Sequence, residues 1–209
     1  MKDTHSCEEI FSQIYLEGRW GKDAQGEGTS GKGSHISNAK VYVVFLQDFL
    51  QKRGIKSVID VGCGDWGLSQ YIDWQGISYI GTDVVVHIIE KNKKQFATPS
   101  IQFICGDALR EDLPAADLFI CKDMMQHLTH QQILKLCEQL PKYTYCLLTN
   151  DVDPLNLSSF NDDLPEAGGE RTLDLTWPPF SLEGEKMLTW SAHDNNMKQV
   201  LFIRNDIPK

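Results

Sequence analysis

The stretch SVIDVGCGDWGLSQYI, from Ser57 to Ile72, decides the fold of this chain. Its first half is a run of apolar and β-branched residues, which is typical of a buried strand, and it leads directly into the spacing G-x-G-x-x-G. Such a turn between a strand and a helix brings the backbone close to a ligand and offers unpaired N–H donors. Asp60 stands two residues before the first glycine, Gly62, where it would repel the pyrophosphate of a dinucleotide. The stretch therefore predicts a nucleotide-type site, and Asp60 restricts which ligand fits it.

Predicted strands and helices alternate downstream of this turn. We expect strands near 57–61, 78–82, 101–105, 117–121 and 143–149, with helices near 66–74, 85–96 and 130–140. Thr129 and Gln132 form a capping box for the last of these helices. Two further strands, near 186–192 and 198–204, are joined by the turn sequence HDNN. The expected fold class is α/β: a Rossmann-like, seven-stranded mixed sheet of five parallel strands plus a C-terminal antiparallel hairpin, with helices on both faces.

Two helices are also expected before the first strand. One covers residues 7–17, and the second is capped by Asn38 and stopped by Gly54. Its apolar positions follow helical spacing and are Val41, Val44, Phe45 and Phe49.

Two segments lack apolar periodicity and are expected to be loops with a function. Residues 18–36 form a Gly-rich loop that we expect to be mobile. Residues 150–185 form a long, Pro-punctuated insert or lid segment. Because the sequence shows no internal repeat and no second strand–helix series, we expect a single domain over residues 1–209.

The composition is that of an ordinary globular protein, with 41% hydrophobic and 23% charged residues. No window approaches the ~18 consecutive apolar residues of a membrane helix. The N-terminal sequence lacks the pattern of a secretory signal, so a cytoplasmic location is expected. The six cysteines include no C-x-x-C pair, which favours reduced thiols and predicts no metal site.

The net charge of −9 bears on the partner. An acidic surface repels nucleic acid unless a local basic patch intervenes, and no dense basic run is present. We therefore expect a small-molecule partner, with neither nucleic acid nor a membrane involved; the oligomeric state is left open.

Three carboxylates stand at the ends of three successive strands. Asp83 comes 21 residues after Gly62, at a position where a carboxylate binds ribose hydroxyls in NAD and S-adenosylmethionine alike. Asp60 favours the second ligand, because the α-ammonium and sulfonium of S-adenosylmethionine are cations. Asp107 is placed to accept the amino hydrogen of an adenine. Each acid alone also fits a turn or helix cap, but their joint occurrence with the glycines favours a cofactor site.

Four segments resemble the motifs of class I S-adenosylmethionine-dependent methyltransferases. VIDVGCGDWG, at 58–67, is similar to the first motif, YIGTDVV, at 79–85, to the second, and CGDAL, at 105–109, to the third. CKDMMQHLT, at 121–129, resembles the segment after the fourth strand, where a histidine before a leucine is common. Trp66 departs from the pattern, since a small residue is frequent there.

This resemblance implies a role for each matching position. Asp60, Gly62 and Gly64 would hold the methionyl part of the cofactor, and Asp83 the ribose, with Val84 beside it. Asp107 and Ala108 would hold the adenine. Lys122 is a further candidate for lining the cofactor pocket, and a solvated side chain is the alternative for it. The implied activity is transfer of a methyl group from S-adenosylmethionine.

The catalytic candidates are His127 and Asp123. Methyl transfer from a sulfonium is an in-line displacement, so a protein contributes alignment and removal of a proton from a hydroxyl or amine. His127 is preferred as the base, because an imidazole with a pKa near ~6.5 suits this task. The alternative for His127 is packing at a helix boundary.

We therefore expect methyl transfer to an oxygen or nitrogen of a small-molecule acceptor, for which Arg171 would anchor a carboxylate or phosphate. The alternatives are an NAD-dependent oxidoreductase and a non-catalytic S-adenosylmethionine-binding protein. Asp60 and the C-terminal hairpin disfavour the first, and no residue excludes the second.

Overall fold

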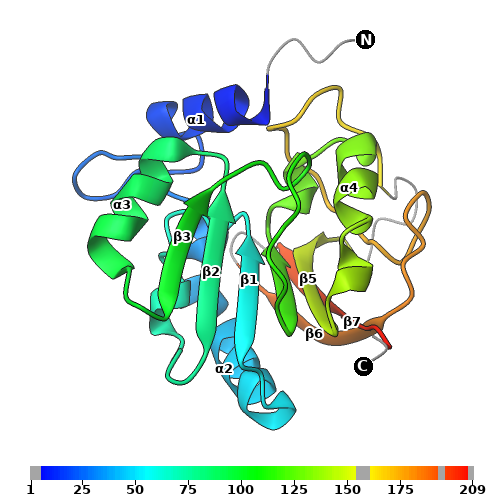
Figure 1. Ribbon diagram of the computed structural model, residues 1–209. Helices are drawn as coiled ribbons and strands as arrows, with labels where there is room; N and C mark the ends of the chain where they lie inside the picture. Colours follow the sequence, from blue (N-terminus) through cyan, green and yellow to red (C-terminus); the bar gives the residue numbers. More distant parts are fainter. Residues whose placement is uncertain (1–5, 154–160, 193–195, 207–209) are drawn as a thin grey trace.

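The computed structural model describes residues 6–153, 161–192 and 196–206. Its strands form one seven-stranded sheet in the order β3-β2-β1-β4-β5-β7-β6 (Figure 1). The strands are β1 Ser57–Val61, β2 Ser78–Asp83, β3 Ile101–Cys105, β4 Leu118–Lys122, β5 Tyr145–Val152, β6 Glu185–Ser191 and β7 Met197–Arg204. The first five run parallel to their neighbours, whereas β7 is antiparallel to both β5 and β6. The predicted fold class is confirmed; most of the predicted HDNN turn lies outside the described residues.

Helices cover both faces of the sheet. They are α1 Cys7–Glu17, α2 Ile36–Arg53, α3 Val86–Phe96 and α4 His130–Cys137. Residues of α1 and α4 share one buried cluster with Ile59 and Phe119, while α2 shares the other with Val58 and Ile120. Successive side chains of a strand point to opposite faces, so Asp60, next to Ile59, points to the α2 face. Figure 1 shows α1 beyond the carboxyl ends of β2 and β3, where it covers this edge of the sheet.

The helix predicted over 66–74 is wrong: the segment contains one 3₁₀ turn, Ser69–Tyr71. Trp66 has a φ of +57°, which interrupts a right-handed helix. The carboxylate of Asp65 accepts the N–H of Gly67 at 3.0 Å and closes a local turn instead. The buried indole of Trp66 then packs edge-on against Tyr79, with ring centroids 5.8 Å apart.

The start and the buried face of α2 also differ from expectation. The helix begins at Ile36, and the side chain of Asn38 donates to the carbonyl of Lys32 at 2.9 Å instead of capping. Val41 and Val44 are 44% and 62% exposed. Of the predicted positions, Phe49 is buried and Phe45 is partly buried, and the rest of the buried stripe is Ala39, Tyr42, Leu46 and Leu50. The helical spacing of apolar residues in α2 fits two overlapping stripes and does not by itself show which one is buried. Tyr42 belongs to the buried stripe.

The helix predicted over 130–140 ends earlier, at Cys137, and is followed by a 3₁₀ turn, Leu140–Lys142, that contains a proline near its start. The capping box of Thr129 and Gln132 is confirmed.

Candidate active site

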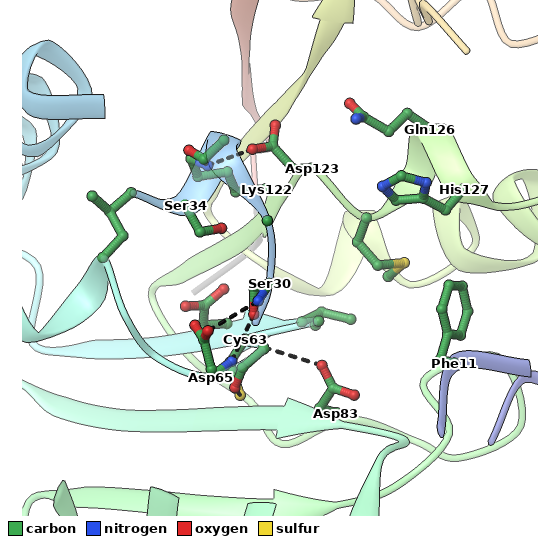
Figure 2. A pocket seen from close by; sticks show the side chains of 18 of the residues that line it. Phe11, Ser30, Ser34, Cys63, Asp65, Asp83, Lys122, Asp123, Gln126 and His127 are labelled. Carbon is green, nitrogen blue, oxygen red and sulfur yellow. Dashed lines mark hydrogen bonds and ion pairs between the residues drawn. The ribbon is translucent and has the colours of Figure 1, made fainter. Parts of the chain in front are cut away.

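A cavity of about 430 Å³ opens at the carboxyl edge of the parallel strands. Its lining comes from the turns after β1, β2, β3 and β4, from α1 and from the Gly-rich loop (Figure 2). Ligands of open parallel sheets bind at this edge, and the volume suits a small molecule. All ten site residues named from the sequence line this one cavity. The Gly-rich loop and the insert contribute further lining residues.

The turn after β1 requires its glycines for packing as well as for conformation. Gly62 and Gly64 have φ values of +72° and +55°. A Cβ on Gly62 would lie 2.7 Å from the side chain of Met124, and one on Gly64 would lie 2.2 Å from Oγ of Ser30. The atoms that exclude a side chain here are therefore protein atoms from the β4 turn and the Gly-rich loop.

The carboxylate of Asp60 is buried, and neighbouring groups offset only part of the cost of burying its charge. Its carboxylate accepts the hydroxyl of Tyr79 at 2.7 Å. Burial raises the pKa of Asp60 to about 6, against the lowering effects of the Tyr79 hydrogen bond and of Lys122. A cationic ligand next to this carboxylate would favour its ionised form.

Asp83 ends β2 and also supports the glycine turn. Its two carboxylate oxygens accept the backbone N–H groups of Gly64 at 3.1 Å and Val85 at 3.0 Å. Burial raises the pKa of Asp83, and these backbone hydrogen bonds oppose the shift. Each carboxylate oxygen retains a second lone pair for a ligand hydroxyl. Val84, the next residue, lines the cavity as well.

Asp107 and Ala108 form the third strand-end pair. The carboxylate of Asp107 accepts the N–H of Leu109 at 2.9 Å and lies 3.4 Å from Nε of Arg110. Ala108 is buried, and its carbonyl accepts from the side chain of Gln139 at 2.6 Å. Asp107 thus closes a local turn while it lines the cavity.

A buried cluster of charged side chains occupies the β4 side of the cavity. One of them, Lys198, was not anticipated from the sequence. Nζ of Lys198, on β7, donates to carboxylate oxygens of Asp123, at 2.9 Å, and of Asp151. Nζ of Lys122 donates to Asp123 and, at 3.1 Å, to the carbonyl of Gly33 in the Gly-rich loop. Lys198 is 1% exposed. No local motif marks it, because its partners are brought together only by the pairing of β5 with β7.

The charge cluster makes Asp123 a counter-ion. Burial alone would raise the pKa of Asp123, but Lys122 and Lys198 outweigh it and hold the pKa at about 2. The residue has a φ of +57°, so its backbone is held in the left-handed region at the end of β4. A carboxylate bound by two ammonium groups is a weak base.

His127 is buried, lines the cavity and has a defined tautomer. Its Nδ1 lies 2.7 Å from the carbonyl oxygen of Gly169, which only accepts, so Nδ1 carries the proton and Nε2 is the acceptor. Burial lowers the pKa of His127, against the opposing effects of Gly169 and nearby carboxylates, so the ring is neutral at pH 7. Within the described part of the chain, Nε2 has no hydrogen-bond partner. Figure 2 shows the ring at the cavity wall above Phe11.

The Gly-rich loop docks on the glycine turn. Ser30 donates its N–H to the carboxylate of Asp65 at 2.9 Å, and its Oγ accepts the N–H of Asp65 at 2.8 Å. The hydroxyl of Tyr15 is 2.7 Å from the same Oγ. Trp20 places its ring 4.9 Å from the ring of His127, centroid to centroid. These contacts join residues far apart in sequence, and the Gly/Ser composition of the loop gave no indication of them.

The part of the chain that the structure describes contains no group of three or more His, Cys, Asp or Glu side chains that could hold a metal ion. None of its helices is long and apolar enough to cross a membrane.

Known proteins resemble both the sequence and the fold. Residues 58–144 match the family described as "Methyltransferase domain". The ubiquinone biosynthesis O-methyltransferase of Coxiella burnetii is 28% identical over 116 residues, which are 53% of this chain and 49% of that protein. This chain thus matches about half the length of its curated relatives.

Solved structures share the fold at low sequence identity. Magnesium protoporphyrin IX methyltransferase from Synechocystis PCC 6803, with bound S-adenosylmethionine, has a TM-score of 0.65 at 13% identity and covers 99% of this chain and 100% of its own. Human N-acetylserotonin methyltransferase, in complex with S-adenosylmethionine, has a TM-score of 0.59 at 14% identity and covers 97% of this chain and 61% of its own.

The family match starts in β1 and ends just before β5, so it includes the glycine turn and all three strand-end carboxylates. The sheet order and the matching structures agree with it. An NAD-dependent oxidoreductase is set aside on these grounds. Residues 58–144 thus match a methyltransferase-domain family, and the fold of the chain is similar to that of methyltransferases solved with bound S-adenosylmethionine.

Proposed function

We propose that this protein transfers the methyl group of S-adenosylmethionine to an oxygen or nitrogen of a small-molecule acceptor. The observation that carries the proposal is the presence, in one cavity, of strand-end carboxylates suited to the cofactor and of a neutral imidazole with an available acceptor nitrogen.

The charges of the cavity suit this cofactor. Asp60 is a buried carboxylate with a raised pKa, so the nearby α-ammonium and sulfonium of S-adenosylmethionine would stabilise its ionised form. The turn at Gly62 and Gly64 and the side chain of Lys122 complete the part of the site proposed for the methionyl group. A pyrophosphate in the same place would meet Asp60 and Asp83 without a compensating cation of its own.

The nucleoside part is assigned to the ends of β2 and β3. Asp83 has lone pairs for the two ribose hydroxyls, and Val84 packs beside them. Asp107 would accept from the adenine amino group, and the backbone N–H of Ala108 would donate to a ring nitrogen. Each of these residues lines the cavity.

In the proposed reaction, the bound cofactor supplies an electrophilic methyl group on a good leaving group. His127 accepts the proton of the attacking hydroxyl or amine at Nε2, while the Gly169 carbonyl holds Nδ1–H and hence the ring orientation. Asp123 acts through charge alone, since it balances Lys122 and Lys198.

The proposed acceptor site is covered by two segments, and their positions suit a small acceptor. We propose that the Gly-rich loop and the described part of the insert, within residues 161–185, enclose it. The insert contacts the β4 turn through the N–H of Gly168, which donates to the carbonyl of His127 at 2.8 Å. Arg171 does not line the cavity, and one of its guanidinium nitrogens lies 3.5 Å from the carbonyl of Gln126. The anchoring role expected for Arg171 therefore has no support from its position.

The first test is calorimetry with S-adenosylmethionine, S-adenosylhomocysteine and NAD. We expect both sulfur nucleosides to bind and NAD not to bind; binding of NAD alone would refute the cofactor assignment. A second test supplies labelled methyl donor to metabolite, RNA and DNA fractions. Label in small molecules is expected, whereas label confined to nucleic acid would contradict the proposed acceptor class. No transfer to any fraction despite cofactor binding would favour a non-catalytic binding protein.

A further inference from the structure

The acceptor side of the cavity has an aromatic wall. The Trp20 ring lies 5.9 Å from Phe11 and 5.5 Å from Tyr15, centroid to centroid, in addition to its contact with His127. All four residues line the cavity. Aromatic rings carry negative charge on their faces and attract a cation that is placed over them. The wall therefore accommodates either a planar group or an alkylammonium group.

The charge of the cavity separates these possibilities. Among the described residues, its lining includes seven carboxylates and four cationic side chains. Two of the cations, Lys122 and Lys198, are already bound to Asp123 and Asp151. A third, Arg19, pairs with Glu17, which lies outside the lining. The cofactor carries one net positive charge, so the cavity stays acidic when it is bound, which disfavours an anionic acceptor.

Glu170 contributes negative charge next to His127. It lies in the insert directly after Gly169, whose carbonyl holds the imidazole, and it lines the cavity. Within the described part of the chain, its carboxylate has neither an ion-pair nor a hydrogen-bond partner. Nε2 of the buried His127 also has no hydrogen-bond partner there. A donor that carries positive charge would satisfy both groups.

We infer that the acceptor is an amine that enters as its ammonium form, with Glu170 and the ring of Trp20 facing the charge and His127 facing an N–H. This inference rests on the proposed methyl transfer and names its acceptor class. The structure assigns Glu170 as the specificity-determining residue.

The step balances without a further reactant. The ammonium gives one proton to Nε2 of His127, which becomes an imidazolium stabilised by the surrounding carboxylates. The freed nitrogen lone pair forms the new N–C bond as the C–S bond of the bound cofactor breaks, and that bond's electron pair stays on sulfur. The products are a methylated ammonium and S-adenosylhomocysteine, and the imidazolium proton then leaves to solvent.

The test uses the full chain loaded with S-adenosylhomocysteine, which prevents turnover, and three probes with the same ring: benzylamine, benzyl alcohol and benzoate. Dissociation constants are measured by NMR titration at pH 7.5, where the first is a cation, the second neutral and the third an anion. We expect benzylamine to bind at least about 10-fold more tightly than benzoate, with benzyl alcohol between them. Equal or tighter binding of benzoate or benzyl alcohol, or no binding of benzylamine, would overturn the inference.

Glu170→Gln removes the proposed charge and Glu166→Gln is its matched control, because Glu166 is an exposed glutamate of the same insert outside the cavity lining. Glu170→Gln should weaken the binding of benzylamine by about 3-fold, which is the usual contribution of an exposed charge pair. The binding of benzyl alcohol, which carries no charge, should stay unchanged. Equal effects of the two variants would contradict the role of Glu170. Binding of S-adenosylhomocysteine is measured first: its absence would count against the proposed function, whereas its presence with the wrong probe order would count against this inference alone.

Discussion

The proposed cofactor half and the proposed acceptor half of the cavity are built in different ways. Most residues of the proposed cofactor half fall between Asp60 and Ala108 at the ends of three successive strands, and Lys122 at the end of β4 completes it. Backbone N–H groups bind the carboxylates of Asp83 and Asp107. The acceptor half assembles side chains from α1, the Gly-rich loop, the β4 turn, the insert and β7. The first half is a local structure repeated at strand ends, and the second exists only once the whole chain has folded. Substitutions should therefore affect cofactor affinity in one half and turnover or acceptor choice in the other.

The largest expected effect is that of His127→Ala on turnover. If His127 is the proton acceptor, turnover with an identified acceptor should fall by roughly 10²–10⁴-fold, because general base catalysis contributes that much. His87→Ala is the control, since His87 is exposed and does not line the cavity. A His127→Ala protein that loses thermal stability but keeps its turnover per folded molecule would show that the imidazole only packs the turn.

The second effect concerns Asp60 and pH. Its pKa of about 6 lies above the ordinary carboxyl value, so the folded chain binds the proton more tightly than the unfolded chain does. The contribution of Asp60 to the free energy of unfolding is therefore lost as the pH rises from about 4 through 6. Affinity for the cationic cofactor should change in the opposite direction and fall about 10-fold between pH 7.5 and pH 5, as the carboxylate is protonated.

Asp60→Asn separates these two contributions. The variant should melt at or above the wild-type temperature at pH 7.5 without ligand, and its cofactor affinity should be weaker and flatter across this pH range. A wild-type affinity that does not change between pH 5 and 7.5 would refute the charge argument that selects a cation over a pyrophosphate.

The smallest effect tests whether the two halves are coupled. Ser30 belongs to the Gly-rich loop but binds Asp65 and Tyr15 beside the glycine turn. Ser30→Ala removes hydroxyl contacts worth about 1 kcal/mol and should lower the melting temperature by about 2–4 °C. Ser100→Ala, on an exposed turn, is the control. Equal melting temperatures for the two variants would mean that the loop does not hold the turn.

The contrast between local structure at strand ends and contacts between distant segments also explains which features could be predicted from the sequence. The alternation of strands and helices and the strand-end carboxylates are local patterns, so the seven-stranded mixed sheet and the placement of Asp60, Asp83 and Asp107 at one edge followed from them. The helix expected over 66–74 failed where Trp66 takes a positive φ to bury its ring among aromatic residues, a tertiary demand that overrides local pattern.

The acceptor half was harder to predict for a physical reason. Lys198 lies between Asp123 and Asp151 because β7 pairs with β5 in one register, and Lys198 opposite Asp151 is part of that register. A lysine in a strand gives no indication of this by itself. Likewise, Trp20 looked like one residue of an irregular loop, and its contact with the ring of His127 depends on the docking of the whole loop.

Calorimetric titration of S-adenosylmethionine into Asp83→Asn and His127→Ala tests the division into two halves most directly, and it needs no known acceptor. Loss of a charge-assisted hydrogen bond to the ribose should weaken binding to Asp83→Asn by about 10-fold or more, while affinity for His127→Ala should stay within about 2-fold of wild type. Asp48→Asn, on the exposed surface of α2, controls for the loss of one negative charge. Unchanged affinity in folded Asp83→Asn, or an equal loss in both variants, would contradict the account.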